Sequence, residues 1–286
     1  MGMRLQETIR KNSGVGWQRR FEPDPATWMI WIPPRGDRVH DPAAMCQGLV
    51  ISDLHLFSRR SRAEELLEEM RDTLASADVL VLNGDVFDFR WSVLPDMRAT
   101  IHAAMDWLDN LMEVRAGRTV HYLLGNHDCV SCFTEALSDF ARTRPSLHCH
   151  ESLLRIGGNV FLHGDCANRR MDAESHRRYR EAWSRDKQRG AVGRFFYDAA
   201  DASGASRKVH DLWFPQAGTV ARVAHHLDHI LPRWRGEIGH CYFGHTHLPF
   251  TGHRHDGVLF HNTGSAIRDM DFLPLAFTCP SATATS

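Results

Sequence analysis

Patterns of buried strands and amphipathic helices alternate along the first half of the chain. Short apolar runs predict strands at residues 48–52, 79–82 and 119–124. Apolar residues at helical spacing predict helices after Ser61, from Asp96 to Val114 and at residues 131–141. The first of these helices is expected to open with a capping box formed by Ser61 and Glu64. This alternation predicts an α/β layered core with largely parallel strands at its centre.

The second half predicts further strands and one long insertion. Strands are expected at residues 147–156, 160–162, 240–243, 258–261 and 275–277, with hairpin turns at 157–158 and 256–257. Between the second and third of these strands, residues 166–235 are expected to form a helical insertion. We therefore predict one domain at residues 46–280, an irregular N-terminal arm at 1–45 and a disordered tail at 281–286.

The composition narrows the class of protein. With 286 residues, 43% of them hydrophobic, the chain is large enough to bury a core. The net charge of −1 gives no sign of a nucleic-acid partner. No apolar run approaches the roughly 18 residues that cross a bilayer, so we expect a soluble, cytoplasmic protein.

Cysteine and histidine usage adds two expectations. The seven cysteines are odd in number and scattered, which predicts reduced thiols and no disulfide framework, and the Cys129/Cys132 pair is expected to be structural or incidental. The 19 histidines hint at metal chemistry. Three of them, His225, His226 and His229, fall on the polar side of a predicted helix and are expected at the surface.

Five predicted strands are each followed by polar residues of the types that bind metals. Because ligands gather at the carboxyl ends of strands in α/β folds, these residues are expected to meet at one edge. Buried carboxylates and imidazoles would be costly there without partners, so their joint occurrence predicts a site. The clusters are Asp53-Leu-His55, Asn83-Gly-Asp85-Val-Phe-Asp88, Gly125-Asn-His-Asp128, His163-Gly-Asp165 and Gly244-His-Thr-His247.

The order and spelling of these clusters resemble the calcineurin-like metallophosphoesterase superfamily. Its pattern is D-x-H, G-D-x-x-D, G-N-H-D/E, H and G-H-x-H, and the resemblance covers roughly residues 48–277. It implies a β-sandwich flanked by helices, with two metal ions at one edge. It also implies that Asp85 bridges the ions, that one ion is held by Asp53, His55 and His247, and that the other is held by Asn126, His163 and His245.

This ligand set favours particular chemistry. Mixed oxygen and imidazole ligands suit Mn²⁺, with Fe or Zn²⁺ as alternatives. Two such ions about 3.5–4 Å apart can share a hydroxide that attacks phosphorus. The resemblance implies that His127 contacts the phosphoryl oxygen or protonates the leaving group, and that Asp128 orients His127.

Two residues in these motifs have undecided roles, and one nearby turn is expected to support the site. Asp88 is either a partner for a ligand histidine or a capping residue, and Asp165 is equally open. Residues 262–265 resemble the Asn-Thr-Gly turn of the superfamily and are expected to steady the metal loops.

The insertion is expected to select the substrate. Residues on the inner face of its first helix are predicted to be Met171, Tyr179, Ala182 and Trp183. The arginines of this region either lie on a solvated charged helix or belong to a cap that binds an anionic, partly apolar substrate over the metals. The candidate substrate-binding residues are Arg169, Arg170, Arg177 and Arg178.

The motifs and the helical insertion also resemble UDP-2,3-diacylglucosamine pyrophosphohydrolases. These enzymes cleave a nucleotide-sugar lipid to UMP and a lipid 1-phosphate during lipid A synthesis at the inner membrane surface, typically with Mn²⁺. The subgroup usually has Arg where this chain has His127. Three hypotheses follow: a hydrolase of such a pyrophosphate with peripheral membrane contact, a general phosphodiesterase for soluble nucleotides or other diesters, and a non-catalytic metal-binding scaffold.

Overall fold

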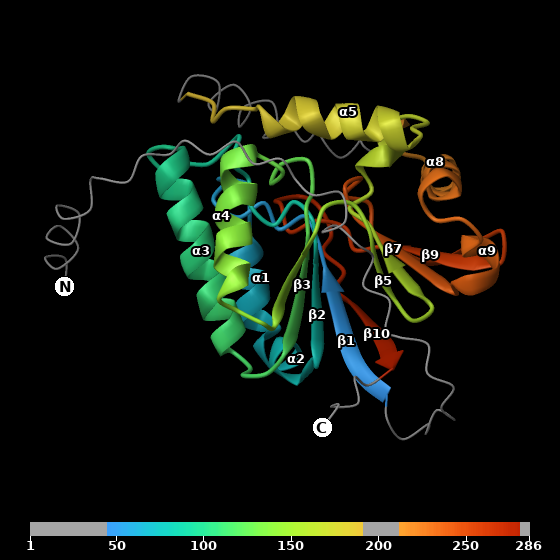
Figure 1. Ribbon diagram of the computed structural model, residues 1–286, viewed down its shortest axis with the longest axis horizontal. Helices are drawn as coiled ribbons and strands as arrows, with labels where there is room; N and C mark the ends of the chain where they lie inside the picture. Colours follow the sequence, from blue (N-terminus) through green and yellow to red (C-terminus); the bar gives the residue numbers. More distant parts are fainter. Residues whose placement is uncertain (1–44, 191–211, 281–286) are drawn as a thin grey trace, which may run out of the picture.

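Two mixed β-sheets pack face to face in the computed structural model, which describes residues 45–190 and 212–280 (Figure 1). The first sheet has the order β10-β1-β2-β3-β4 and is parallel except for β10. The second has the order β5-β6-β7-β9-β8, with antiparallel strands at both edges. Nearly all of the predicted arm, the middle of the insertion (191–211) and the predicted tail lie outside the described residues.

Each sheet contains five strands. The first sheet consists of β1 (Met45–Ile51), β2 (Val79–Asn83), β3 (Thr119–Leu123), β4 (Leu147–His150) and β10 (Leu275–Pro280). The second consists of β5 (Leu154–Ile156), β6 (Asn159–Phe161), β7 (His240–Phe243), β8 (Phe250–His255) and β9 (Val258–Asn262).

Helices cover the outer faces of both sheets. The first sheet is covered by α1 (Ala63–Glu69), α2 (Arg71–Ser76), α3 (Met97–Glu113) and α4 (Ser131–Arg142), and the second by α8 (Gln216–Ile230) and α9 (Trp234–Glu237). The short helix η2 (Asp165–Asn168) and α5 (Ala173–Ser184) follow β6, and α5 lies across the edge at which the parallel strands end (Figure 1). The predicted α/β sandwich is confirmed.

Apolar side chains form three cores, one between the sheets and one under each helical layer. Val50, Val81 and Leu123 point from the first sheet toward Phe161 and Tyr242 of the second. Their neighbours along the strands point to the opposite face and pack under the helices, as the alternation of a strand requires. No helix within residues 45–190 and 212–280 has the length and hydropathy to cross a bilayer.

Two predicted elements differ from the structure. The strand expected at 147–156 is two strands, β4 and β5, which belong to different sheets. Glu151 and Ser152 are exposed between them, so the chain leaves the first sheet there and enters the second. The predicted capping box is wrong: α1 begins after Arg62, while the Ser61 hydroxyl donates to Leu54 O at 2.6 Å.

The expectation of reduced thiols is also wrong for one pair of cysteines. Cys46 and Cys279 face each other across β1 and β10, with Cα atoms 5.2 Å apart, and form a disulfide. Their separation of 233 residues conceals this pairing in the sequence, because only the strand register brings them together. Cys129 is buried and Cys132 exposed, and both are free thiols.

Three histidines on the neighbouring strands β3 and β4 should make the free energy of unfolding depend on pH. His121 is buried beside His148, and its Nδ1 lies 3.0 Å from His150 Nε2. Burial and these two neighbours lower the pKa of His121 to about 3, and burial with His148 lowers that of His150 to about 4. The folded chain therefore holds these rings neutral where the unfolded chain protonates them. Stability should be full above about pH 6.5 and fall as the pH drops toward 4, by about 1.4 kcal/mol per pH unit for each histidine.

Urea unfolding of the chelator-treated protein at pH 7 and pH 5 measures this effect. His121→Gln should reduce the loss of unfolding free energy between the two pH values. His102→Gln on the exposed face of α3 is the control and should leave that loss unchanged. An equal loss in wild type and His121→Gln would contradict the assignment.

Candidate metal centre

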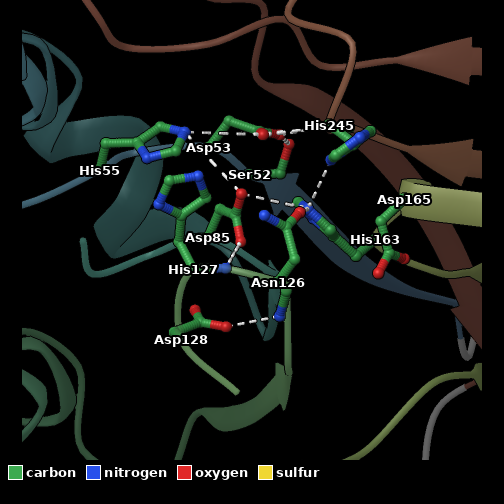
Figure 2. A network of polar contacts seen from close by, with 12 residues as sticks. Ser52, Asp53, His55, Asp85, Asn126, His127, Asp128, His163, Asp165 and His245 are labelled. Carbon is green, nitrogen blue, oxygen red and sulfur yellow. Dashed lines mark hydrogen bonds and ion pairs between the residues drawn. The ribbon is translucent and has the colours of Figure 1, made fainter. Parts of the chain in front are cut away.

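The polar clusters that follow the strands meet at one edge of the sandwich (Figure 2). At the first position, His247 Nε2 lies 3.3 Å from both Asp53 Oδ1 and His55 Nε2. His55 Nε2 lies 3.9 Å from Asp53 Oδ1. The structure thus brings together the three residues expected to hold one ion.

The second position lies on the other side of Asp85. His163 Nε2 is 3.2 Å from Asp85 Oδ2, 3.3 Å from Asn126 Oδ1 and 3.3 Å from His245 Nδ1. Asp85 Oδ2 is also 3.9 Å from His55 Nε2, so its carboxylate faces both positions. This is the arrangement that a bridging ligand requires.

Strained backbone holds most of these ligands in place. Asp53, His55, Asp85, His245 and His247 all have φ between 46° and 65°, in the left-handed region that residues with a Cβ rarely adopt. Such conformations cost about 1–3 kcal/mol each and concentrate at functional sites. Among the described residues other than glycine, nine have positive φ, and these candidate ligands make up five of them.

The charge of the site suits a cation. Asp53 and Asp85 are almost fully buried, and their ion pairs within the described part of the chain are all with histidines. Burial by itself would raise the pKa of both carboxyl groups, but neighbouring imidazoles hold the pKa of Asp53 below and that of Asp85 well below the usual range. Buried carboxylates of this kind are stable when paired or when they coordinate a metal. Oxygen and imidazole ligands together fit a divalent transition ion.

His127 is held by Asp88. His127 Nδ1 lies 3.1 Å from Asp88 Oδ1, and His55 Nδ1 lies 3.4 Å from Asp88 Oδ2. Asp88 also accepts from the backbone N–H of Trp91 at 2.9 Å, so it is both a histidine partner and a turn-capping residue. Although burial opposes it, the charges of Asp88 and Asp85 raise the pKa of His127 to about 9.

Asp128 has a different place from the one expected. Its Oδ2 accepts from Val86 N at 2.9 Å and from the Tyr122 hydroxyl at 2.8 Å, and its Oδ1 accepts from Gly125 N. The expectation that it orients the His127 ring is therefore corrected. Asp128 fixes the loop backbone around Asn126, and Asp88 contacts the ring.

The turn at residues 262–265 contacts the metal loops. Asn262 Nδ2 donates to Gly244 O at 2.8 Å, and the Ser265 hydroxyl donates to Asp53 O at 2.9 Å. The Thr263 and Ser52 hydroxyls also bond to each other, and the Ser52 hydroxyl bonds to the Asp53 carboxylate. These bonds hold the two loops that carry Asp53 and His245.

The candidate substrate residues of the insertion divide into two places. Arg177 and Arg178 are exposed on α5 and pair with Glu174 and, for Arg177, Glu181. Arg169 and Arg170 are exposed immediately after Asn168, whose Oδ1 lies 3.0 Å from His245 Nε2. The backbone of Arg169 and Arg170 is therefore close in sequence to a residue that contacts the candidate metal centre.

The predicted inner face of the first insertion helix is correct for three of its residues. Met171 is buried and Tyr179 and Trp183 are half-buried, but Ala182 is exposed. Arg180 is buried instead and pairs with Asp165. The sequence did not distinguish it from the surface arginines of the same helix. The expectation that His226 lies at the surface is wrong: its ring is buried against that of His176 on α5, and its Nδ1 lies 3.1 Å from Met171 O. His225 and His229 are half-buried and exposed, respectively.

Comparisons with known proteins place the chain in a family. The sequence profile of the calcineurin-like phosphoesterases matches residues 49–249. The chain therefore belongs to the calcineurin-like phosphoesterase family and is a metal-dependent phosphoester hydrolase. No curated protein sequence matches it significantly.

Two solved structures are similar in outline. One is a phosphopantetheinyl hydrolase from Mycobacterium tuberculosis, with 15% identity, a TM-score of 0.40 and coverage of 78% of this chain and 91% of that chain. The other is a dimetal phosphatase from Danio rerio, with 13% identity, a TM-score of 0.36 and coverage of 78% and 88%.

Proposed function

We propose that this chain binds two divalent ions, with Mn²⁺ as the first candidate, and hydrolyses a phosphodiester or pyrophosphate bond. The observation that carries the proposal is the gathering of candidate ligands around Asp85, where Asp53, His55 and His247 form one group, Asp85, His163 and His245 another, and His127 lies within reach of His55 and Asp85. When bound, the ions would activate water and neutralise charge on the phosphoryl group. Asp85 would be shared, with Asp53, His55 and His247 on one side and Asn126, His163 and His245 on the other.

The chain's own residues supply positioning and proton transfer. The His127 backbone N–H donates to Asp85 Oδ1 at 2.8 Å, so its loop is tied to the shared carboxylate. Asp88 holds the ring through Nδ1, which leaves the Nε2 edge for the substrate. We assign His127 the role of contacting the phosphoryl oxygen or protonating the leaving group.

His127→Ala should leave metal binding intact and slow hydrolysis by about 10²-fold or more. The ring is not among the proposed ligands, so its loss removes the contact with the reacting group and the pairing with Asp88 but no proposed metal ligand. Metal content by elemental analysis and turnover of a diester at saturating Mn²⁺ test this. Loss of metal along with activity would assign His127 to the metal site instead.

The substrate that fits these surroundings is anionic and partly apolar. Phe214 lies against His245, with ring centroids 6.2 Å apart, and Leu212 and Trp213 beside it are 79% and 69% exposed. Arg169 and Arg170 are exposed near the same histidine. Exposed aromatic and aliphatic side chains next to cationic ones favour a phosphorylated amphiphile. UDP-2,3-diacylglucosamine is our first candidate, with peripheral contact at a membrane surface.

Hydrolysis of UDP-2,3-diacylglucosamine beside a soluble diester, at equal Mn²⁺, tests the proposal, with Asp85→Asn protein as the blank. Release of UMP with a strong preference for the lipid is the expected result. Cleavage of the soluble diester alone would favour the general phosphodiesterase, to which His127 in place of the subgroup's Arg also points. Metal binding without cleavage of either would contradict both substrate proposals.

A further inference from the structure

Arg180 is a buried arginine on α5 that joins two loops of the candidate metal centre. Its guanidinium pairs with Asp165, with Nη2 at 3.0 Å from Oδ1 and Nε bonded to Oδ2. Its Nη1 donates to Leu124 O at 2.8 Å and to Gly125 O at 3.1 Å. One rigid planar group therefore spans the loop after β3 and the loop after β6.

These two loops carry two candidate ligands of the same ion. Asn126 follows Gly125, and His163 lies two residues before Asp165, so both ligands sit beside the atoms that Arg180 holds. Asn126 Oδ1 and His163 Nε2 are 3.3 Å apart. The guanidinium thus sets the distance between the two loops at the point where their ligands converge.

The third candidate ligand of this ion also contacts the insertion. His245 Nε2 lies 3.0 Å from Asn168 Oδ1, and Asn168 Nδ2 donates to the Tyr179 hydroxyl at 3.0 Å. With the proton on Nε2, the Nδ1 lone pair of His245 faces His163 at 3.3 Å. A bond from outside the ligand set fixes the ring orientation and tautomer of a metal-binding histidine.

The other position has supports of a different origin. Asp53 O accepts from Ser265 and from Ala266 N at 3.0 Å, and His55 Nδ1 faces Asp88. These partners belong to the loops that follow β2 and β9, not to α5. Among the described residues, α5 therefore hydrogen-bonds to the loops of the second position, whereas near the first position it makes a ring contact, between Trp183 and His127, with centroids 5.1 Å apart.

We propose that α5 supports the metal position formed by Asn126, His163 and His245, through Arg180 and through Tyr179 acting on Asn168. The affinity of this position depends on how α5 is seated, whereas the affinity of the position formed by Asp53 and His55 does not. Arg180 and Tyr179 are positioning residues. The inference rests on the proposed two-metal function.

Arg180→Lys is the sharpest test, because lysine keeps the positive charge beside Asp165 but has all its donors on one nitrogen and lacks the planar fork that spans the carboxylate and both carbonyls. Arg185 offers a matched Arg185→Lys control, because it is exposed, lies just after α5 and pairs with Glu181 of that helix. Tyr179→Phe removes only the hydroxyl that holds Asn168. All are made in the full chain.

Mn²⁺ bound per chain is measured by equilibrium dialysis over a range of free Mn²⁺, followed by elemental analysis. Wild type and Arg185→Lys should bind two ions. Arg180→Lys should bind the first ion as wild type does and the second about 10–100-fold more weakly, and Tyr179→Phe should weaken the second several-fold. Activity of Arg180→Lys should recover as Mn²⁺ is raised.

Unchanged affinity for both ions in Arg180→Lys, or equal weakening of both, would overturn the inference. Thermal melting and far-ultraviolet circular dichroism check that the variant folds, and if it does not, Tyr179→Phe decides on the same criterion. Wild type that binds fewer than two ions would instead contradict the proposed two-metal function, and this is seen before any variant is compared.

Discussion

Asp85→Asn should abolish hydrolysis and weaken both metal positions together. The Asp85 carboxylate faces His55 Nε2 at 3.9 Å and His163 Nε2 at 3.2 Å, so it is the one anionic group among the described residues placed between the two candidate ligand sets. Two divalent ions repel each other, and a neutral amide offsets that repulsion less than a carboxylate does. We expect a loss of activity of at least about 10²–10³-fold, with metal content well below two per chain.

The fold should survive this change. Asparagine has nearly the same shape as aspartate, and its Oδ1 can still accept the His127 backbone N–H that Asp85 accepts at 2.8 Å. Thermal melting with chelator and with Mn²⁺ separates the effects: wild type should gain stability from Mn²⁺, and Asp85→Asn should gain much less. Retention of both full metal content and activity by the variant would refute the assignment of Asp85 as the shared ligand.

Gly125→Ala should damage both stability and activity, for a steric reason. A Cβ at this position would lie 2.1 Å from Asp85 Oδ1 and 2.3 Å from the Asp85 backbone nitrogen. Because the second contact is with backbone, the loop after β2 or the loop after β3 has to move. Overpacking of this kind costs about 1–3 kcal/mol. Movement of either loop also displaces Asp85 or Asn126, so we expect activity to fall by about 10²-fold or more.

Gly239→Ala is the matched control, since its Cβ would meet nothing within 4 Å. Chemical denaturation and diester turnover at saturating Mn²⁺ compare the two variants with wild type. Gly239→Ala should behave nearly as wild type. If Gly125→Ala did so as well, the close approach of the two loops would have no functional role.

Much of the fold and of the candidate site could be predicted from local sequence. Strands β2 and β7 and helix α3 lie where apolar spacing placed them, because a strand or an amphipathic helix buries one face that its own residues define. The short clusters at the strand ends likewise lie in consecutive residues. Parallel strands then bring those ends to one edge whatever the details of the loops, and the expected ligands meet there.

Contacts between distant segments could not be predicted in the same way. Asp128 follows His127 directly, yet the ring is held by Asp88, because the orientation of each side chain depends on how two loops face each other. Arg180 is one of several arginines on one helix, and its burial depends on where α5 rests on the strand ends.

The sequence of this protein therefore specifies which chemical groups are present and at which edge of the sheets they gather. The edge follows from the local spacing of apolar residues, which recur at every second position in a strand and about every 3.6 positions in a helix. The three-dimensional packing decides which groups touch. It pairs Cys46 with Cys279 across 233 residues, moves the chain from one sheet to the other after His150, and places the guanidinium of Arg180 against two separate loops. These outcomes depend on strand register and on the seating of α5, which are properties of the whole chain and of no single segment.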